Sequence, residues 1–276
     1  MSFVHLHLHS QYSLLEATCQ FKGVVRQASQ WQMPAVALTD KGNMFGAIEF
    51  YFAAKDAGLN PIVGMEVYLA PKSRLVKGED REAAGQPNRR LVLLAMDYVG
   101  YQNLCRISTI GYQEGFYYKP RVDYESLRAH GRNLIALTGS AMGDVPWTFL
   151  NRGADEALVR LNQLKEIFDD RLYLEITRTG TRSCDQVNPW LVEASQISGV
   201  PLVATNDVHY LRQEDQVGQE VLICIGSNKT LQDDSRFKLG SDQFYFKSPE
   251  QMLEIFRDMP EVCARTVEIA NRCHLK

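Results

Sequence analysis

The 276-residue sequence has no close cysteine pair, no excess of positive charge and no long apolar run. Its six cysteines are scattered without a Cys-x-x-Cys pair, which argues against a zinc ribbon or a disulfide framework and for reduced thiols in the cytoplasm. The net charge of -3 provides no global cationic field, so binding of duplex DNA through bulk charge is disfavoured. No apolar run approaches the roughly 20 residues of a membrane helix. The first residues lack the basic and apolar regions of a secretory signal peptide.

Short β-rich runs alternate with segments of helical periodicity along most of the chain. Seven runs are expected to be strands: 3–9, 35–40, 61–70, 91–97, 133–139, 171–178 and 201–207. The second and the seventh are almost continuously apolar, as expected of parallel strands that are covered on both faces. Seven strands that alternate with helices favour an α/β fold, a distorted TIM-like βα barrel; an open doubly wound sheet is the alternative.

The remaining segments predict helices, one loop and the limits of the barrel. Apolar residues recur at helical spacing over 21–31 and 158–168, whereas the polar segment 71–90 predicts a solvated loop. Beyond Gly226 the alternation stops. Ser248 followed by Pro249 predicts a helix start, and a last helix is expected from 260 to 272. We therefore expect one domain over 1–276, with a barrel over 1–227 and carboxy-terminal helices in an extension over 228–276.

Four of the six histidines lie in two places of the sequence. His5, His7 and His9 fall in the first expected strand, and His209 directly follows the seventh. Because alternate residues of a strand share a face, the first three imidazoles are expected on one face, opposite three apolar residues. Imidazoles two residues apart on one face can converge on one metal ion, so this pattern favours a metal site.

Carboxylates lie at or near the ends of other expected strands, the edge at which barrels build their sites. They are Glu16, Asp40, Glu66 and Asp207. Three neighbouring histidines on a buried strand each need polar partners. The sequence therefore predicts one pocket that contains His7, His9, Glu66, Asp207 and His209.

Simpler interpretations remain open for four of the nearby residues. Asp40 is also suited to cap a following helix at Asn43, and Glu16 to lie in a solvated loop. Glu175 and Arg178 on the sixth expected strand either line the same pocket or form a surface ion pair.

Five separated motifs resemble one family in the correct order. They are HLHSQYSLLE at 7–16, ALTDKGN at 37–43, PIVGMEVYL at 61–69, LLAMDYVGYQNL at 93–104 and ATNDVHY at 204–210. The sequence resembles the polymerase and histidinol phosphatase (PHP) domain family, and within it the amino-terminal PHP domains of bacterial replicative DNA polymerase III alpha subunits. The resemblance runs from about Phe3 to the end of the chain, and it implies a barrel pocket for up to three metal ions.

The resemblance also implies which residues bind metal. Six of nine ligand positions match the family: His7, His9, Glu16, Glu66, Asp207 and His209. The other three are substituted by Lys41, Arg90 and Ser140, and His5 and Asp40 are neighbours of the pocket. Protonated Lys and Arg side chains have no lone pair for a metal.

The substitutions affect the three implied metal positions differently. One position keeps its whole set, His7, His9, Glu66 and Asp207, and is expected to hold one Zn, Mn or Mg ion. A second position, which shares Glu66, loses its other ligands because Arg90 and Ser140 stand in their places. A third keeps only Glu16 and His209. Crowded carboxylates repel one another unless cations offset their charge. We therefore hypothesise that salt bridges from the substituted residues have replaced metal ions.

Two functions remain open. The resemblance implies a structural module of the polymerase alpha subunit that serves as a docking platform for a proofreading exonuclease and is inactive alone. Its partners would be the rest of the alpha subunit, the exonuclease subunit and, through the holoenzyme, DNA, in the cytoplasm and away from membranes. The Mg-dependent polymerase centre would lie beyond residue 276. The alternative is an active metal-dependent 3′→5′ exonuclease or phosphoesterase.

Overall fold

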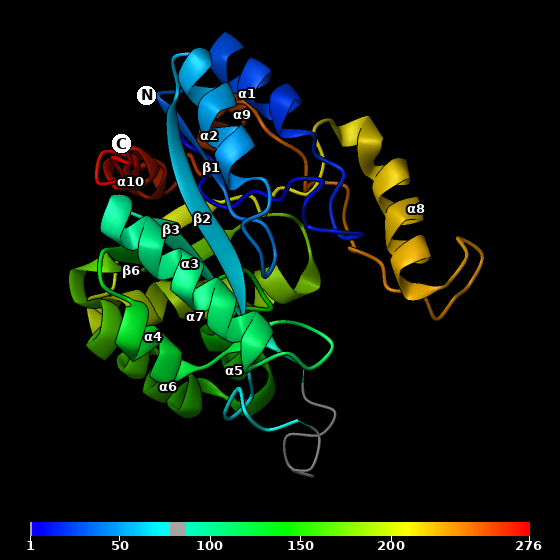
Figure 1. Cartoon of the computed structure of the whole chain (residues 1–276). Coiled ribbons are helices and arrows are strands. Elements are labelled where there is room, and N and C mark those ends of the chain that lie inside the picture. Colours follow the sequence, from blue (N-terminus) through cyan, green and yellow to red (C-terminus); the bar gives the residue numbers. More distant parts are fainter. Residues whose placement is uncertain (1, 78–86) are drawn as a thin grey trace.

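The computed structural model describes residues 2–77 and 87–276, and its centre is a curled seven-stranded sheet (Figure 1). The strands run in the spatial order β1-β2-β3-β5-β6-β7, and β4 pairs with β2. Their bounds are β1 Ala35–Leu38, β2 Asn60–Leu69, β3 Arg89–Ala95, β4 Arg121–Val122, β5 Leu134–Leu137, β6 Leu172–Thr177 and β7 Leu202–Thr205. The sheet and its surrounding helices form the expected distorted α/β barrel.

Helices follow most of the strands and cover the outside of the sheet. They are α1 Phe21–Gln30, α2 Ala47–Asp56, α3 Tyr98–Gln113, α4 Tyr124–His130, α5 Asp144–Arg152, α6 Ala154–Phe168, α7 Arg182–Ser198, α8 Gln216–Ser227, α9 Pro249–Ile255 and α10 Pro260–Ala270. The expected helices at 21–31 and 158–168 correspond to α1 and α6. In the described residues, no helix is long and apolar enough to span a membrane.

Strand β3 runs antiparallel to both of its neighbours, β2 and β5, while β1–β2, β5–β6 and β6–β7 are parallel pairs. A parallel crossover needs a dozen or more residues, usually with a helix. The connection from β2 to β3 was expected to be a polar loop over 71–90, of which residues 78–86 lie outside the described residues. The antiparallel direction of β3 therefore distinguishes this distorted barrel from a regular parallel one.

The expected first strand, 3–9, is an extended segment without regular strand pairing. Its backbone nevertheless bonds on both sides: the amide of Ala37 donates to His5 O (3.0 Å), and the amide of His9 donates to Val208 O (2.9 Å). The segment thus lies between β1 and β7, the two ends of the strand order, and connects them. The sequence analysis did not predict β4, which is only two residues long.

Side chains alternate between the inside of the barrel and the layer beneath the helices. On β3, Val92 and Leu94 belong to an interior cluster that is closed by Ile269 of α10. Leu91 and Leu93 belong to a second cluster with residues of α6, α7 and α10. The last two helices therefore pack on the barrel core, while the division at residue 227 remains a prediction.

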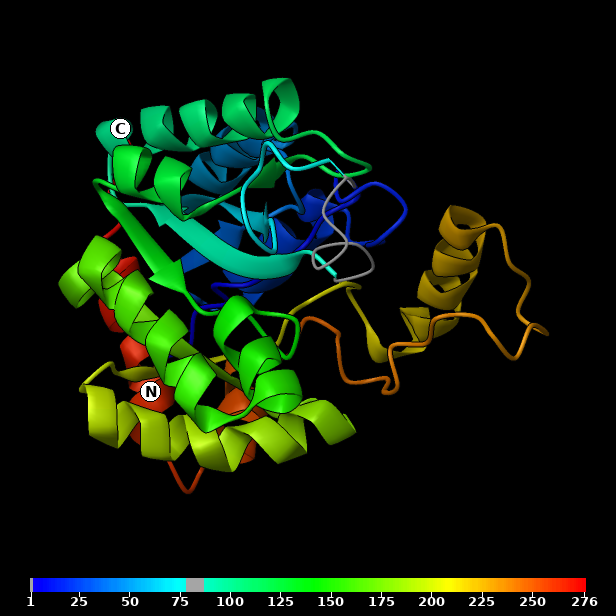
Figure 2. The ribbon, with the colours of Figure 1, turned by 90° about the horizontal axis from the view of Figure 1, so that it is seen from below.

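Helix α8 and the loop that follows it stand away from the body of the molecule, as two perpendicular views show (Figures 1 and 2). By contrast, α9 and α10 lie against the body and begin as the sequence predicts. Ser248 and Gln251 form reciprocal side-chain to backbone hydrogen bonds at the start of α9, and α10 begins at Pro260.

Candidate metal centre and its substituted positions

Four predicted ligands from three parts of the chain meet in one buried pocket. His7 and His9 come from the amino-terminal extended segment, Glu66 from β2, and Asp207 from the residues after β7. The Nε2 atom of His7 lies 3.6 Å from Glu66 Oε1 and 3.6 Å from Asp207 Oδ1. The Nε2 atom of His9 lies 3.1 Å from Asp207 Oδ1. The closure of the sheet brings together side chains that are 198 residues apart in sequence.

This arrangement fits one divalent metal ion. Ligand atoms of His7, His9 and Glu66 lie within 4.8 Å of one another, and all three residues are buried. Among the described residues, no hydrogen-bond partner faces the buried Nε2 atom of His7. Imidazole nitrogens together with carboxylate oxygens suit Zn²⁺, and Mn²⁺ accepts the same donors. Asp207 completes the set that the sequence predicts.

Glu175 orients His7 from the side opposite the candidate metal. Its Oε1 atom lies 2.7 Å from His7 Nδ1 and also accepts a hydrogen bond from Thr205. Because a carboxylate accepts, Nδ1 carries the proton and Nε2 faces the pocket, which is the usual carboxylate–histidine–metal arrangement. Burial alone would lower the pKa of His7, but the charges of Glu175 and Asp207 raise it well above its ordinary value.

Lys41 lies between two of the predicted ligands, Glu16 and His209. Its Nζ atom is 2.9 Å from His209 Nε2 and 3.2 Å from Glu16 Oε2. His209 Nδ1 lies 2.7 Å from the backbone oxygen of Asp207 and must donate, because a carbonyl only accepts. The Nε2 lone pair therefore accepts from the Lys41 ammonium. Burial and the nearby Lys41 charge lower the pKa of His209 to about 3.

Arg90 pairs with Glu66 from the neighbouring strand. Its Nη1 atom donates to Glu66 Oε2 at 2.8 Å, and its guanidinium lies over the ring of Tyr68. Although burial opposes ionisation, the Arg90 charge holds the pKa of Glu66 well below its usual range. A guanidinium therefore stabilises the carboxylate that the second implied metal position would use.

Ser140, the third substituted position, also faces the pocket. Its hydroxyl donates to Asp207 Oδ2 at 2.8 Å. Burial would raise the pKa of Asp207, but the His7 charge and the hydrogen bond from His9 lower it well below its ordinary value. All three substituted positions therefore contact a carboxylate or an imidazole that the sequence analysis assigned to metal binding.

Sequence reasoning missed two residues at the mouth of the pocket. Lys119 Nζ lies 2.6 Å from Glu16 Oε1, and the Tyr68 hydroxyl donates to the same oxygen at 3.2 Å. Tyr68 was detectable, because it lies two residues after Glu66 and shares its strand face. No sequence pattern marks Lys119, which lies in the loop before β4.

Two further residues, predicted as neighbours of the pocket, use their side chains for other contacts. The Nε2 atom of His5 donates to the backbone oxygen of Lys247, and its ring packs between Phe3 and Phe246. His5 therefore does not join His7 and His9 in the pocket, because its ring contacts Lys247, Phe3 and Phe246 instead. Asp40 accepts hydrogen bonds from Ser10 and Ser13 and holds the loop before α1, so it does not cap at Asn43.

The open question about the sixth strand is also resolved. Glu175 lies inside the pocket, as described above, and is completely buried. Arg178 instead pairs with Asp258 at 2.8 Å, away from Glu175. The two residues therefore do not form an ion pair with each other.

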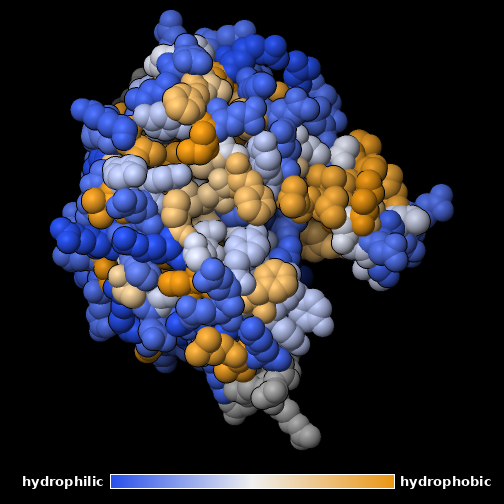
Figure 3. Space-filling view, viewed as in Figure 1, coloured by the Kyte–Doolittle hydropathy of each residue, from blue (hydrophilic) through white to orange (hydrophobic). Residues whose placement is uncertain are grey.

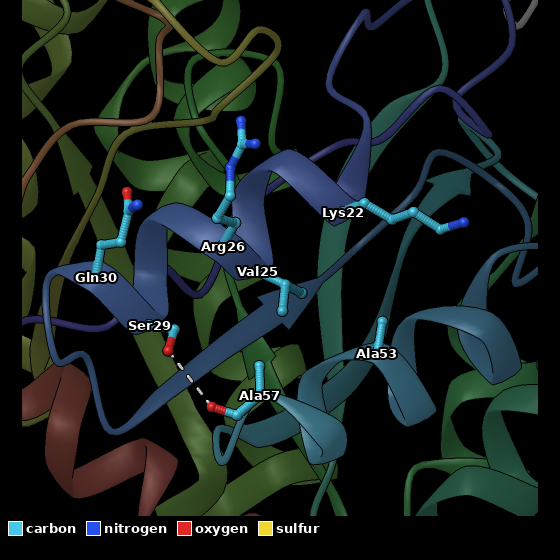
Figure 4. Close-up of a pocket in the computed structure, with 7 residues that line it drawn as sticks. All are labelled: Lys22, Val25, Arg26, Ser29, Gln30, Ala53 and Ala57. Atoms are coloured by element: carbon cyan, nitrogen blue, oxygen red, sulfur yellow. Dashed lines mark hydrogen bonds between the residues drawn. The ribbon is translucent and has the colours of Figure 1, made fainter.

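A second depression lies between α1 and α2, as Figure 4 shows. It is lined by Lys22, Val25, Arg26, Ser29, Gln30, Ala53 and Ala57. Its two cationic side chains, Lys22 and Arg26, are exposed. The hydroxyl of Ser29 reaches Ala57 O at 3.4 Å. The residues that line it include no buried charge and no group of metal ligands, unlike the barrel pocket.

Comparisons with known proteins show the family to which the chain belongs. Residues 5–179 match the PHP domain family. The chain is 41% identical over 271 residues to DNA polymerase III subunit alpha of Borreliella burgdorferi, and 42% identical over 277 residues to that of Treponema pallidum. These matches cover 98% and 100% of this chain but only 24% of each relative. The chain thus spans about a quarter of the length of these relatives.

Solved structures resemble the chain more distantly. One is an amidohydrolase from Chromobacterium violaceum, with 15% identity and a TM-score of 0.49, covering 75% of this chain and 88% of that one. We infer nothing about activity from this distant similarity. The family match over residues 5–179, which contains four of the six retained ligand positions, carries the assignment: the chain belongs to the PHP domain family.

Proposed function

We propose that this chain is the amino-terminal PHP module of a bacterial replicative DNA polymerase III alpha subunit, acting in chromosome replication in the cytoplasm. Its metal site is partly replaced by salt bridges, and its role is structural. It stabilises the polymerase chain and offers a docking platform to a proofreading exonuclease. The names of the relatives, at about 40% identity across the whole chain, support the polymerase context.

The main observation in support of the loss of metal ions is the position of Lys41 between Glu16 and His209. Its ammonium uses the lone pair of His209 Nε2 and neutralises Glu16, so a metal ion would have to displace it. Arg90 acts in the same way on Glu66. The residues present therefore do not fit a second or third metal ion.

The remaining position fits a metal ion, held by His7, His9, Glu66 and Asp207. An ion there would act as a Lewis acid on a bound phosphoryl group. Two-metal cleavage of a phosphodiester needs ions about 3.5–4 Å apart that hold both reacting oxygens. With the neighbouring position taken by a guanidinium, this chain supplies only half of that arrangement, which supports a non-hydrolytic role.

A residual metal-dependent phosphoesterase is the second candidate. The buried and unpartnered Nε2 atom of His7, aimed at two carboxylates, favours it. Metal analysis separates the two candidates. The proposed function predicts at most one equivalent of Zn²⁺ or Mn²⁺ per purified chain and no release of nucleotides from single-stranded DNA. Two or more equivalents, or hydrolysis that a chelator abolishes, would contradict it.

The docking role needs its own experiment. A proofreading exonuclease subunit from the same source should elute with the chain in size-exclusion chromatography, in the presence of a chelator. A Lys41→Gln/Arg90→Gln variant, if still folded by circular dichroism, should retain the complex, because these side chains lie inside the pocket. Failure of the wild-type chain to bind the exonuclease would refute the docking role and leave the metal argument standing.

A further inference from the structure

Helix α8 carries an apolar face that lies open to solvent among the described residues. The inner side of the helix is held to the body of the molecule, because Gln219 is buried and donates to the backbone oxygen of Glu16 at 2.7 Å. One flank is held by the loop that follows the helix, where Arg236 Nη2 lies 2.6 Å from Glu220 Oε2. The side away from the body has no such contact within residues 2–77 and 87–276.

The open side consists of apolar residues and one glycine. Because an α-helix has about 3.6 residues per turn, Val217, Val221 and Ile225 lie along one side, with Gly218 and Leu222 beside them. Val217 and Ile225 are each 63% exposed, and Figure 3 shows apolar surface gathered over α8. A surface helix normally turns charged and polar residues to solvent. These five residues, here called the apolar α8 face, therefore indicate an interaction surface.

The apolar α8 face fits a second copy of itself. When two antiparallel α8 helices cross at Val221 on a twofold axis, Val217 of one chain meets Ile225 of the partner subunit. Residues four apart form the ridges that pack in the commonest helix crossing. At Gly218 there is open space where a Cβ atom would lie, so side chains of an opposing helix can come close to the backbone. Both copies thus offer the same surface, and the contact closes with two chains.

The two ends of α8 carry opposite charges that are exposed. Glu214 lies two residues before the helix, and Lys229 lies two residues after it. Glu214 has Arg212 Nη1 at 3.9 Å, and Lys229 donates to the Ser235 hydroxyl at 3.2 Å. An antiparallel crossing at Val221 brings Glu214 beside Lys229 of the partner subunit, whereas a parallel pair would bring like charges together. The charges therefore favour an antiparallel second copy as the occupant of this face.

We propose that the apolar α8 face is a dimer interface, in which α8 packs antiparallel against α8 of a second copy of this chain. The arrangement also sets the two helix dipoles antiparallel, which is favourable. Helix α8 has 12 residues and is about 18 Å long, so the interface is smaller than the standard of about 800 Å² per partner. The dimer should therefore form with rising concentration. The proposal uses no residue of the barrel pocket and does not depend on the proposed function.

The first test is the mass of the 276-residue chain in sedimentation equilibrium, with a reductant present because Cys105 is exposed. Chain concentrations from about 1 to 100 µM bracket a micromolar Kd. The mass should rise with concentration from the 31.3 kDa of one chain toward twice that value. Val221→Glu sets two carboxylates at the twofold axis and should raise Kd at least tenfold. Ile197→Glu, at an apolar residue of α7 that is 62% exposed, is the matched control and should behave as the wild type.

Exchange of the end charges tests the antiparallel direction. Glu214→Lys and Lys229→Glu should each weaken the dimer, because each brings two like charges together across the interface. The two substitutions combined should restore the wild-type Kd, since the pair forms again with its signs reversed. Within one chain the two positions lie about 20 Å apart, beyond the Debye length of about 8 Å. The restoration can therefore come only from contact between two chains.

Three results would overturn the proposal. They are a chain that stays at 31.3 kDa at every concentration, a dimer that Val221→Glu leaves unchanged, and a charge exchange that restores nothing. If Val221→Glu is unfolded by circular dichroism, Ile225→Ser, which shortens an exposed side chain of the same face, takes its place and must weaken the dimer. The metal and nucleotide measurements that test the proposed function are independent of these results, so either proposal can fail alone.

Discussion

His209 uses both ring nitrogens for hydrogen bonds within the protein. Its Nδ1 atom must donate to the Asp207 carbonyl, so Nε2 accepts from Lys41. The imidazole is held neutral, and its pKa falls to about 3 because of burial and the Lys41 charge. A residue type that usually indicates a metal site is here part of a chain of hydrogen bonds, and its chemistry depends on residue 41.

Arg90 should stabilise the fold through Glu66. Replacing Arg90 by Gln leaves a buried carboxylate, only 4% exposed, without its closest cation. Removing one member of a buried pair typically costs about 3 kcal/mol of unfolding free energy. Urea denaturation with a chelator present should show a loss of this order.

The matched control for this substitution is Arg257→Gln. Arg257 pairs with Glu254 at 2.8 Å, but both side chains are more than two-thirds exposed. Surface pairs of this kind contribute little because solvent screens them. If Arg90→Gln unfolds at the same denaturant concentration as Arg257→Gln, the stabilising role of Arg90 is wrong.

Lys247 should make stability depend on pH above neutrality. Burial lowers its pKa from 10.5 to about 7, and its ammonium donates to Asn206 Oδ1 at 3.3 Å. Between about pH 7 and pH 10.5 the unfolded chain holds this proton and the folded chain has lost it. Unfolding therefore takes up a proton, and stability should rise with pH across this window.

Lys247→Met isolates this contribution. The free energy of unfolding of the wild type, measured from pH 7 to pH 10, should rise more steeply than that of the variant. The difference between the two slopes cancels the titration of cysteines and tyrosines elsewhere in the chain. Parallel slopes would show that Lys247 keeps an ordinary pKa in the fold.

At the scale of elements, the start of α9 offers a direct test of a local signal. The Ser248 hydroxyl accepts a hydrogen bond from the backbone N–H of Gln251, and the Gln251 side-chain oxygen accepts one from the backbone N–H of Ser248. Ser248→Ala should therefore cost about 1 kcal/mol of unfolding free energy. Ser29→Ala, which removes a long 3.4 Å contact of an exposed hydroxyl, should cost less. Thermal unfolding compares the two, and equal losses would contradict the capping role.

The sequence predicted elements well where the signal is local. The start of α9, the helices α1 and α6, and the apolar strands β1 and β7 all follow from periodicity and caps. The sequence did not predict strand pairings that depend on residues far away in the chain. The direction of β3 depends on how the connection from β2 returns, and the pairing of residues 3–9 depends on Val208, two hundred residues after Leu8.

The same distinction applies to the pocket. His7, Glu66 and Asp207 were predicted to meet because a closed sheet brings the first and seventh expected strands together. Glu175 was left undecided between pocket and surface, because its role depends on which face of β6 meets His7. Lys119 has no local signal, and only the packing of its loop brings it to Glu16.

At the scale of the whole molecule, restoring the missing ligands should couple metal binding to stability. Lys41→His, Arg90→His and Ser140→Cys together replace two cations and a hydroxyl by donors that suit Zn²⁺. A ligand that binds only the folded chain stabilises it, by about 3 kcal/mol when its free concentration is a hundred times Kd. The triple variant should therefore melt higher with Zn²⁺ than without it.

The single variants are the controls for this experiment. Each leaves the other two positions as they are, so none should gain stability from Zn²⁺ to the same degree. Metal content of the dialysed proteins provides a second measurement. A wild-type chain that already holds two or more equivalents of metal, and whose melting temperature falls when a chelator removes them, would refute the replacement of metal ions by salt bridges.

The segment 2–10 has a consequence for the order in which the molecule is completed. It carries His7 and His9, and one side of its backbone pairs with Val208. A ribosome that adds about 5–20 residues per second needs roughly 10–40 s to make the intervening chain. During that time the first residues to emerge lack this partner. The pocket can therefore be assembled only after the chain through His209 has been made, although its first histidines are made at the start.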